Sequence, residues 1–438
     1  TTEANRTYGT IVLRGGRLTK WKGKAASLSP SLGQLIASVS PVALGRALMV
    51  GASKTATAAV LGGAGLIVTT SGASADCSPS GAGVYTCSSD ATTTQTLTGS
   101  GSLLDVTIVD PATSFDTSGT VGADAFKLTS NAGITFEDET DGATITGGHD
   151  GINAEITGAT GGISITTTGT TTGGDYGINV YNHGTGAVNI TTTGTTIGTT
   201  GNGIFAKIYG TDLTINAATT TGATDGINAI NSGTGALNIT TSGAITGGTG
   251  YGIRTITAAN KTSNITLNSG TVVSSTAGLG IYNNEGNSIT TVNTGASVAG
   301  KIALGKGIDI LVLAGGDLSG VTQFDGGGGI LDILKFSGFS GSINSARISN
   351  WESVEINKGS TIAFSNKALT INTLGINTGG TLNAVSGTFA LTGNMSNSGT
   401  VNMADGDTGD KVTVSGNFSG SGQVNIDVDT KANTSDQL

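Results

Sequence analysis

The sequence predicts an all-β fold, a parallel β-helix in which short strands coil into the stacked turns of one solenoid. Three observations lead to this prediction. A Gly-Ile pair recurs at a steady interval, a second column of apolar pairs recurs with it, and the composition is rich in glycine and poor in charged and aromatic residues. Units of this kind cannot bury an apolar face alone and must stack on their neighbours.

The Gly-Ile pairs follow one another at spacings of 26, 26, 23, 26 and 28 residues, starting at Gly151. One period earlier, the position is held by Ala125-Phe126. Because each strand returns after a full turn in the same direction, successive units are expected to pair in parallel, about 4.8 Å apart. The large residues of the column then form one inward ladder: Phe126, Ile152, Ile178, Ile204, Ile227, Ile253 and Ile281.

The second column consists of two apolar residues that lie two positions apart, which places both on the same face of a strand. Its members recur at steps of 25, 25, 24 and 28 residues: Ile163 and Ile165, Val188 and Ile190, Leu213 and Ile215, Leu237 and Ile239, and Ile265 and Leu267. The polar residues between them include Asn-x-Thr triplets at Asn189, Asn238 and Asn264. We expect these triplets to face outward from the strands rather than to carry sugar.

The composition excludes several classes of protein. Of 438 residues, 74 are Gly, 4 are Pro and only 11% are charged. The low charge argues against disorder, and the lack of a three-residue glycine period excludes collagen. Residues 1–75 hold eight Lys or Arg and a single acid, so the remaining chain holds 12 bases and 28 acids. An acidic body of this kind argues against a nucleic-acid partner.

Residues 1–75 are predicted to form an extended secretory signal peptide. A basic region extends from Arg14 to Arg46, the apolar run 56–68 follows, and Ala73 and Ala75 place small side chains before a cleavage site at Asp76. The alternative, a membrane-spanning helix, would need about 20 apolar residues. The run is shorter and is interrupted by glycines.

Residues 76–121 are expected to form an N-terminal cap and the first irregular turns. The two cysteines of the chain, Cys77 and Cys87, follow the proposed cleavage site directly. An exported chain meets an oxidising compartment, so a small disulfide loop is predicted. A zinc site would need more ligands, and His149 and His183 are the only histidines. We therefore predict no metal or other cofactor.

The regular turns of about 25 residues are expected over 122–300, and a less regular β-helix over 301–438. Strands are predicted there around residues 307–313, 329–336, 351–356, 369–371, 381–382, 388–391, 400–403, 412–414 and 424–428. The turns between them are rich in Gly and Asn. No final membrane barrel follows before Leu438.

Taken together, the long leader ending in Ala73-Ser74-Ala75, the Cys77 to Cys87 loop and the segment 305–358 resemble the passenger region of type V autotransporters of Gram-negative bacteria. The resemblance covers nearly the whole chain and depends more on the order of parts than on any single motif. It implies a right-handed parallel β-helix, exported to the outer membrane, cell surface or medium through a C-terminal translocator barrel. Since that barrel is absent here, we expect the chain to be a fragment.

Two segments offer candidate calcium sites, and each has a simpler explanation. Asp124, Asp150 and Asp225 precede Gly-Ile-type pairs, with Asn202 in the same column, and stacked carboxylates can bind Ca²⁺. Asp and Asn before Gly are also ordinary turn formers, which is the interpretation we prefer. The segment 326–334 partly matches a calcium-binding glycine and aspartate nonapeptide, but Asp332 comes one residue late.

An enzyme is not predicted, and no catalytic residues are assigned. A serine protease would need Ser, His and Asp within reach of one another, and a polysaccharide lyase would need clustered carboxylates with a base. We expect a non-catalytic surface or secreted passenger that adheres to host, matrix or neighbouring-cell components through its long polar face. A lyase-like carbohydrate-active enzyme and a structural stalk stay open as alternatives.

Overall fold

The computed structural model describes residues 60–61, 66–67, 77–111, 113–138 and 142–438. The chain divides into two compact units, Thr1–Ala73 and Ser74–Leu438. In the first unit, β1 (Val60–Leu61) pairs antiparallel with β2 (Leu66–Ile67). The predicted cleavage residues Ala73, Ala75 and Asp76 lie outside the described residues, as does most of the proposed signal peptide.

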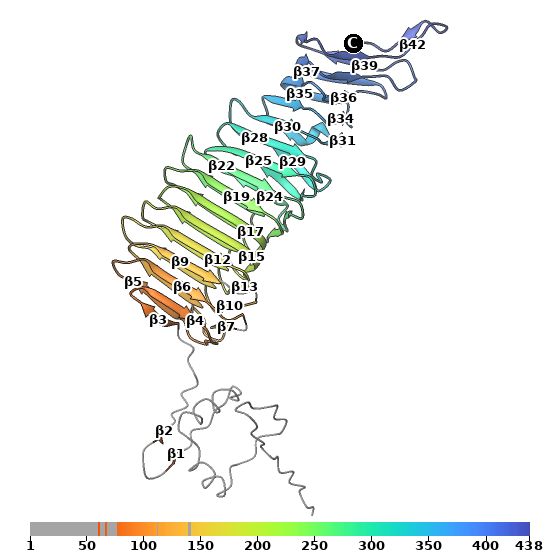
Figure 1. Ribbon diagram of the computed structural model, residues 1–438. Coiled ribbons are helices and arrows are strands. Elements are labelled where there is room, and N and C mark those ends of the chain that lie inside the picture. The colour runs from red at the N-terminus through yellow and green to blue at the C-terminus, as the bar shows by residue number, and fades with distance from the viewer. Residues whose placement is uncertain (1–59, 62–65, 68–76, 112, 139–141) are drawn as a thin grey trace, which may run out of the picture. The chain divides into compact units, whose positions relative to one another are not determined.

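The second unit is a parallel β-solenoid, whose strands stack turn upon turn in Figure 1. Helix is nearly absent from the described residues, where one short 3-10 turn, η2 (Ser345–Arg347), interrupts the strands. None of the described residues belongs to a helix with the length and apolar character needed to cross a membrane. The predicted fold class, an all-β parallel β-helix, is therefore confirmed.

One face of the solenoid is an 11-stranded sheet, which we call the Gly-Ile sheet because each Gly-Ile pair introduces or opens one of its strands. In spatial order its strands are β5 (Gln95–Gly99), β8 (Phe126–Ser130), β11 (Ile152–Ile156), β14 (Ile178–Asn182), β16 (Ile204–Ile208), β18 (Ile227–Asn231), β21 (Ile253–Thr257), β24 (Leu279–Asn283), β27 (Gly300–Ala303), β29 (Val321–Asp325) and β32 (Ile348–Ser349).

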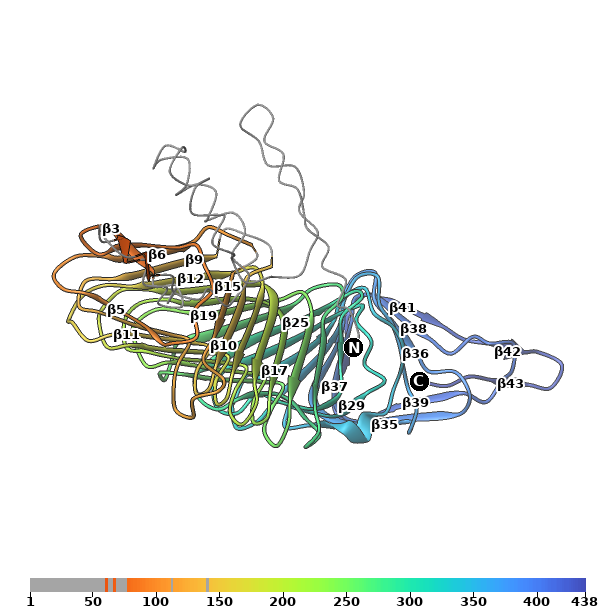
Figure 2. The ribbon, with the colours of Figure 1, turned by 90° about the horizontal axis from the view of Figure 1, so that it is seen from below.

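A 23-stranded sheet, here the long sheet, forms the other sides of the regular turns. Most of its strands are β3 (Ser78–Gly81), β4 (Val84–Cys87), β6 (Leu104–Ile108), β9 (Ile134–Asp138), β12 (Ile163–Thr167), β15 (Val188–Gly198), β17 (Leu213–Gly222), β19 (Leu237–Thr241), β22 (Thr262–Leu267), β25 (Asn287–Asn293), β28 (Asp309–Ala314), β30 (Ile333–Phe336), β33 (Ser353–Ile356), β35 (Ala368–Ile376), β37 (Thr388–Asn397), β39 (Lys411–Val414) and β40 (Phe418–Ser419). Figure 2 shows β6, β9 and β12 along a different side of the stack from β5 and β11.

The remaining strands of the long sheet form its short column, which continues through the second halves of β15 and β17. They are β7 (Ser114–Asp116), β10 (Thr144–Gly147), β13 (Thr170–Gly173), β20 (Ala244–Gly247), β23 (Val272–Ser275) and β26 (Ser297–Val298). Two further sheets lie toward the C-terminus. The five-stranded C-terminal sheet contains β31 (Ser340–Ile343), β34 (Thr361–Phe364), β36 (Thr381–Asn383), β38 (Thr400–Asn402) and β41 (Gln423–Asn425), and a hairpin joins β42 (Val428–Asp429) to β43 (Thr434–Ser435).

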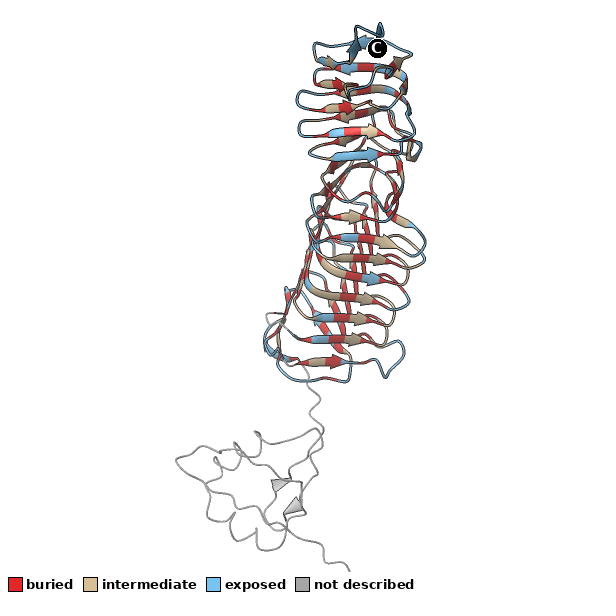
Figure 3. Cartoon of the chain, turned by 90° about the vertical axis from the view of Figure 1, so that its right-hand side faces the viewer, coloured by how far each residue is buried: buried red, intermediate tan, exposed pale blue. Residues whose placement is uncertain are grey.

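The predicted ladder of the Gly-Ile sheet is confirmed residue by residue. Phe126 pairs with Ile152, Ile152 with Ile178, and the register continues without a slip to Ile281. All seven side chains are fully buried. Figure 3 shows the resulting alternation, with buried residues along the strands and exposed ones at the turns. The hydrophobic ladder therefore forms a continuous core along this sheet.

The second predicted column is confirmed up to Leu237 and corrected at the next step. Ile163, Val188, Leu213 and Leu237 follow one another in register on the long sheet. Leu237 then pairs with Ser263, and Ile239 pairs with Ile265. The predicted partner of Leu237, Ile265, was therefore two residues too far along. Because the error is an even number of residues, the apolar side chains still point inward.

The turns shorten toward the C-terminus. Ile163 and Val188 pair at a step of 25 residues (188 − 163), whereas Ile333 and Ser353 pair at a step of 20 (353 − 333). The short column ends where this change occurs, at an isolated bridge between Ser297 and Asp317. One turn later the same side of the solenoid is taken up by β31. A seam therefore separates the short column from the C-terminal sheet.

Candidate functional site

The acidic column that the sequence singled out forms a buried corner next to the Gly-Ile sheet. Asp124, Asp150 and Asp225 are at most 7% exposed. Asp124 Oδ1 accepts a hydrogen bond from the main-chain N–H of Asp150 at 3.1 Å, and Asp150 Oδ1 accepts one from that of Tyr176 at 3.2 Å. Each carboxylate thus caps the same position of the following turn.

Tyr176 ends the first run of carboxylate caps, and a second run starts one turn later at Asn202. Asn202 Oδ1 accepts from the Asp225 N–H at 3.0 Å, and Asp225 Oδ1 accepts from the Tyr251 N–H at 2.7 Å. The second carboxylate oxygens are occupied by asparagine amides, as between Asn179 and Asp150 at 2.8 Å. The structure supports the interpretation of these residues as turn formers.

His149 joins this corner from the exposed side. Its Nδ1 lies 2.9 Å from Asp124 Oδ1 and 3.4 Å from Asp150 Oδ1, and its Nε2 lies 3.9 Å from Asp175 Oδ2. The hydrogen bond to Asp124 raises the pKa of His149, while burial raises the pKa of Asp150. The ligand atoms of Asp124, His149 and Asp150 lie within 4.8 Å of one another, so among the described residues these three could hold a metal ion. Their oxygens already accept protein hydrogen bonds.

Aromatic side chains gather on the outer face of the Gly-Ile sheet, a feature that sequence reasoning missed. The chain has seven tyrosines, and five of them lie on or beside this face: Tyr176, Tyr181, Tyr209, Tyr251 and Tyr282. Strand alternation explains their placement, since Ile178 and Val180 of β14 point inward and Tyr181 points outward. None of these side chains is needed to fill the apolar ladder.

Three of these tyrosines join a phenylalanine and a histidine in one continuous cluster. We call it the aromatic band: Tyr176, Tyr181, His183, Phe205 and Tyr209. The Phe205 ring lies 5.5 Å from that of Tyr176 and 5.3 Å from that of Tyr181. His183 stacks with Tyr181 at 6.3 Å and with Tyr209 at 5.7 Å. Such distances are typical of favourable ring contacts, so the band is held together across β14 and β16.

Charged groups border the band. Lys207 Nζ lies 5.4 Å from the centre of the Tyr209 ring, and His183 Nε2 lies 3.6 Å from Glu155 Oε1. The phenol of Tyr176 is protonated at neutral pH in any case, and burial raises its pKa further above the ordinary value of 10.0. The surface therefore offers apolar ring edges, hydroxyl groups and both signs of charge within a few turns.

A second aromatic pair lies farther along the same sheet. The rings of Tyr251 and Tyr282 stack at 4.8 Å. A pocket of about 120 Å³ beside them is lined by Tyr251, Leu279, Ile281, Tyr282, Lys301 and Ala303. Lys301 Nζ lies 2.7 Å from Asp325 Oδ2, so its charge is paired.

At the N-terminal end of the solenoid, Cys77 and Cys87 form a disulfide that joins the first described residue of the second unit to the end of β4. Neither cysteine lies near the aromatic band in sequence, and β4 belongs to the long sheet. The disulfide fastens the first turn rather than forming part of the candidate surface.

Comparison with known proteins finds no matching family model, no matching curated protein and no matching solved structure.

Proposed function

We propose that this chain is a non-catalytic binding scaffold that is exported and displayed on a cell surface or secreted, as the passenger of a type V autotransporter. Its solenoid would wind right-handed, as nearly all parallel strand connections do. The partners would be components of a host cell, of extracellular matrix or of a neighbouring cell, and its own translocator barrel would serve its export. The aromatic band is the observation on which the binding role depends.

The composition of the band supports an interface. Tyrosine supplies a large apolar surface and a hydroxyl while losing little conformational entropy on binding. Aromatic residues are enriched where binding energy is concentrated. In a chain with 4% aromatic residues, a gathering of rings on one outer face is costly to expose without a partner.

The rest of the solenoid supports export and display. Its outward positions are mostly Thr, Asn and Ser, as in β12 and β15, which suit a solvated surface. The disulfide between Cys77 and Cys87 is typical of an oxidising compartment. The acidic body and the small number of basic residues favour partners other than nucleic acid.

The proposal is tested by measuring adhesion of the purified chain to fixed cells, matrix proteins and glycan arrays. A triple variant, Tyr181→Ser, Phe205→Ser and Tyr209→Ser, should weaken binding at least about ten-fold. The matched control changes Ser164, Asn189 and Thr214 to Ala, which form one outward row on the long sheet. Equal binding by both variants would reject the band as the interface.

Two further outcomes decide between the alternatives. Absence of binding to every surface by the unaltered chain would favour a structural stalk. Release of unsaturated sugar from an acidic polysaccharide, followed by its ultraviolet absorbance, would establish a lyase instead.

A further inference from the structure

The seam between the short column and the C-terminal sheet leaves the edge of one strand, β31, facing a segment that forms no strand of its own. On one side, the segment 316–319 follows β28 and is tied to the short column by the bridge between Ser297 and Asp317. On the other side, β31 follows β30 and lies at the end of the five-stranded sheet. Because β28 and β30 pair directly, the long sheet continues without a break across this level.

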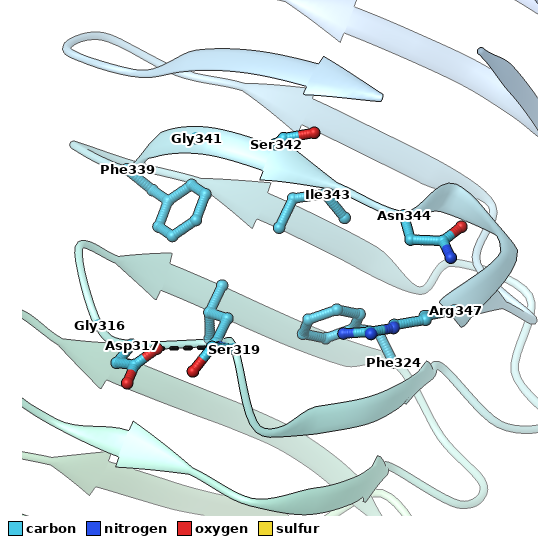
Figure 4. Close-up of a pocket in the computed structure, with 11 residues that line it drawn as sticks. Gly316, Asp317, Ser319, Phe324, Phe339, Gly341, Ser342, Ile343, Asn344 and Arg347 are labelled. Carbon is cyan, nitrogen blue, oxygen red and sulfur yellow. Dashed lines mark hydrogen bonds between the residues drawn. The ribbon is translucent and has the colours of Figure 1, made fainter. Parts of the chain in front are cut away.

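A pocket of about 260 Å³ occupies the opening. Its lining includes Leu318 and Ser319 from one edge, Ser342 and Ile343 from the other, and Phe324. Figure 4 shows the side chains of Phe324, Phe339 and Ile343 directed into the space between the Asp317 segment and β31. Phe324 is 1% exposed and Ile343 6%, so the floor of the pocket is the solenoid core itself.

The main chain of β31 presents hydrogen-bonding groups to this pocket. The carbonyl oxygens of Phe339 and Ile343 accept from the N–H groups of Thr361 and Ser365, at 3.1 and 3.0 Å, on the β34 side. Alternate residues of a parallel strand direct both main-chain groups to the same side. The peptide groups of Ser340 and Ser342 therefore face the opposite side, on which Ser342 lines the pocket.

One positive charge stands at the end of the pocket. Arg347 Nη1 donates a hydrogen bond to the main-chain oxygen of Val321 at 2.9 Å, which holds the guanidinium across the seam. Within the part of the chain that the structure describes, no carboxylate lies within ion-pair distance of Arg347. Asp317, the acid that lines the pocket, accepts instead from the Ser319 N–H at 2.9 Å. An arginine held this way prefers a carboxylate ligand.

We propose that the seam pocket binds an extended acidic peptide from another protein, which pairs with β31 as an added strand. Its main chain would bond to the peptide groups of Ser340 and Ser342, an apolar side chain would pack on Phe324 and Ile343, and a carboxylate would meet Arg347. Strand addition to an open sheet edge is a common mode of peptide recognition. The four-residue length of β31 limits unselective pairing.

This site is separate from the proposed adhesion surface. The aromatic band lies on β14 and β16, more than 100 residues before β31. The triple variant of the band should therefore leave peptide binding unchanged, so that failure of one proposal does not decide the other.

The test uses the full chain and a library of hexapeptides that alternate Thr with large apolar residues and end in Asp. Peptides retained by the protein are titrated by fluorescence anisotropy. Arg347→Gln should weaken binding by about ten-fold or more. Lys335→Gln removes a charge that is 3.8 Å from Glu355, outside the pocket lining, and should change nothing.

A second pair of variants tests the strand pairing directly. Ser342→Pro removes an N–H that faces the pocket and leaves the β31–β34 hydrogen bonds in place, since proline is tolerated on a sheet edge. It should abolish binding, whereas Ser342→Ala should preserve it. Circular dichroism and melting temperature confirm that each variant is folded.

The peptide supplies the final control. Replacing its Asp by Asn should weaken binding to the unaltered chain but not to the Arg347→Gln variant. Retention of no peptide above the level seen with Arg347→Gln, or equal binding by the Pro and Ala variants, would overturn the proposal.

Discussion

The main-chain N–H of Asp309 donates a hydrogen bond to Asp332 Oδ1 at 2.8 Å, across two neighbouring turns. The N–H of Asp332 in turn donates to Glu352 Oε2 at 2.8 Å. Both aspartates are fully buried. Burial, reinforced by the neighbouring acid in each case, raises the pKa of Asp309 to about 7 and that of Asp332 to about 6. Three acids thus stack at the start of three successive strands of the long sheet, β28, β30 and β33.

This acid ladder predicts that stability falls as the pH rises from about 4 to about 7. The folded chain holds protons that the unfolded chain, with ordinary carboxyl pKa values near 3.8, has already released. Asp309→Asn should remove much of this slope and raise the free energy of unfolding at pH 8 by about 1–2 kcal/mol. Urea unfolding at several pH values measures the free energy of unfolding and its slope with pH. Asp317→Asn is the control, because hydrogen bonds from Ser319 lower the pKa of that exposed acid.

His149 makes a smaller contribution to the pH dependence of stability, in the same direction as the acid ladder. The hydrogen bond to Asp124 raises the pKa of His149 above its ordinary value of 6.5. The stabilisation is complete below that value and is lost as the pH rises through the raised pKa. In urea unfolding, His149→Gln should reduce the free energy of unfolding at pH 6 more than at pH 8, by less than about 1 kcal/mol since the ring is 44% exposed. A comparable difference between pH 6 and pH 8 in His183→Gln would contradict this, because the one acid within ion-pair distance of His183 among the described residues is Glu155, at 3.6 Å.

Buried threonines on the short column offer a stabilising change. Thr171, Thr196 and Thr220 stack in register, are fully buried, and their hydroxyl groups have no hydrogen-bond partner. Thr196→Val keeps the shape and removes an unsatisfied polar group, so it should raise the free energy of unfolding by about 1 kcal/mol. Thr192→Val is the matched control, since Thr192 Oγ1 accepts from the Ala218 N–H at 3.3 Å. That change should destabilise the chain, and a gain in both variants would refute the argument.

Glycine at the corners is required by close approach of the main chain. A Cβ added at Gly173 would collide with the main-chain oxygen of Tyr176 and lie 2.9 Å from the nitrogen of Gly151. Gly173→Ala should therefore lower the free energy of unfolding by about 1–3 kcal/mol or more. Thermal or urea unfolding of both variants measures this. Gly119→Ala, where an added Cβ meets no atom within 4 Å, should be nearly neutral.

The sequence by itself determined the solenoid, its period and the inward ladder from Phe126 to Ile281. These follow from a two-residue alternation of apolar side chains within each strand and from its recurrence, and both are local properties that can be read along the chain. The capping role of Asp124 and Asp150 was also within reach, because Asp before Gly forms turns in any context.

Only the tertiary structure decided the rest. The pairing of Leu237 with Ser263, the aromatic band, the acid ladder at Asp309 and the seam beside Arg347 all depend on which turn lies against which. That alignment is set by the varying lengths of the turns between strands, and a change of a few residues there moves a side chain along its neighbour without altering the hydrophobic pattern. The pattern can therefore fix the core while leaving the surface and its openings undetermined.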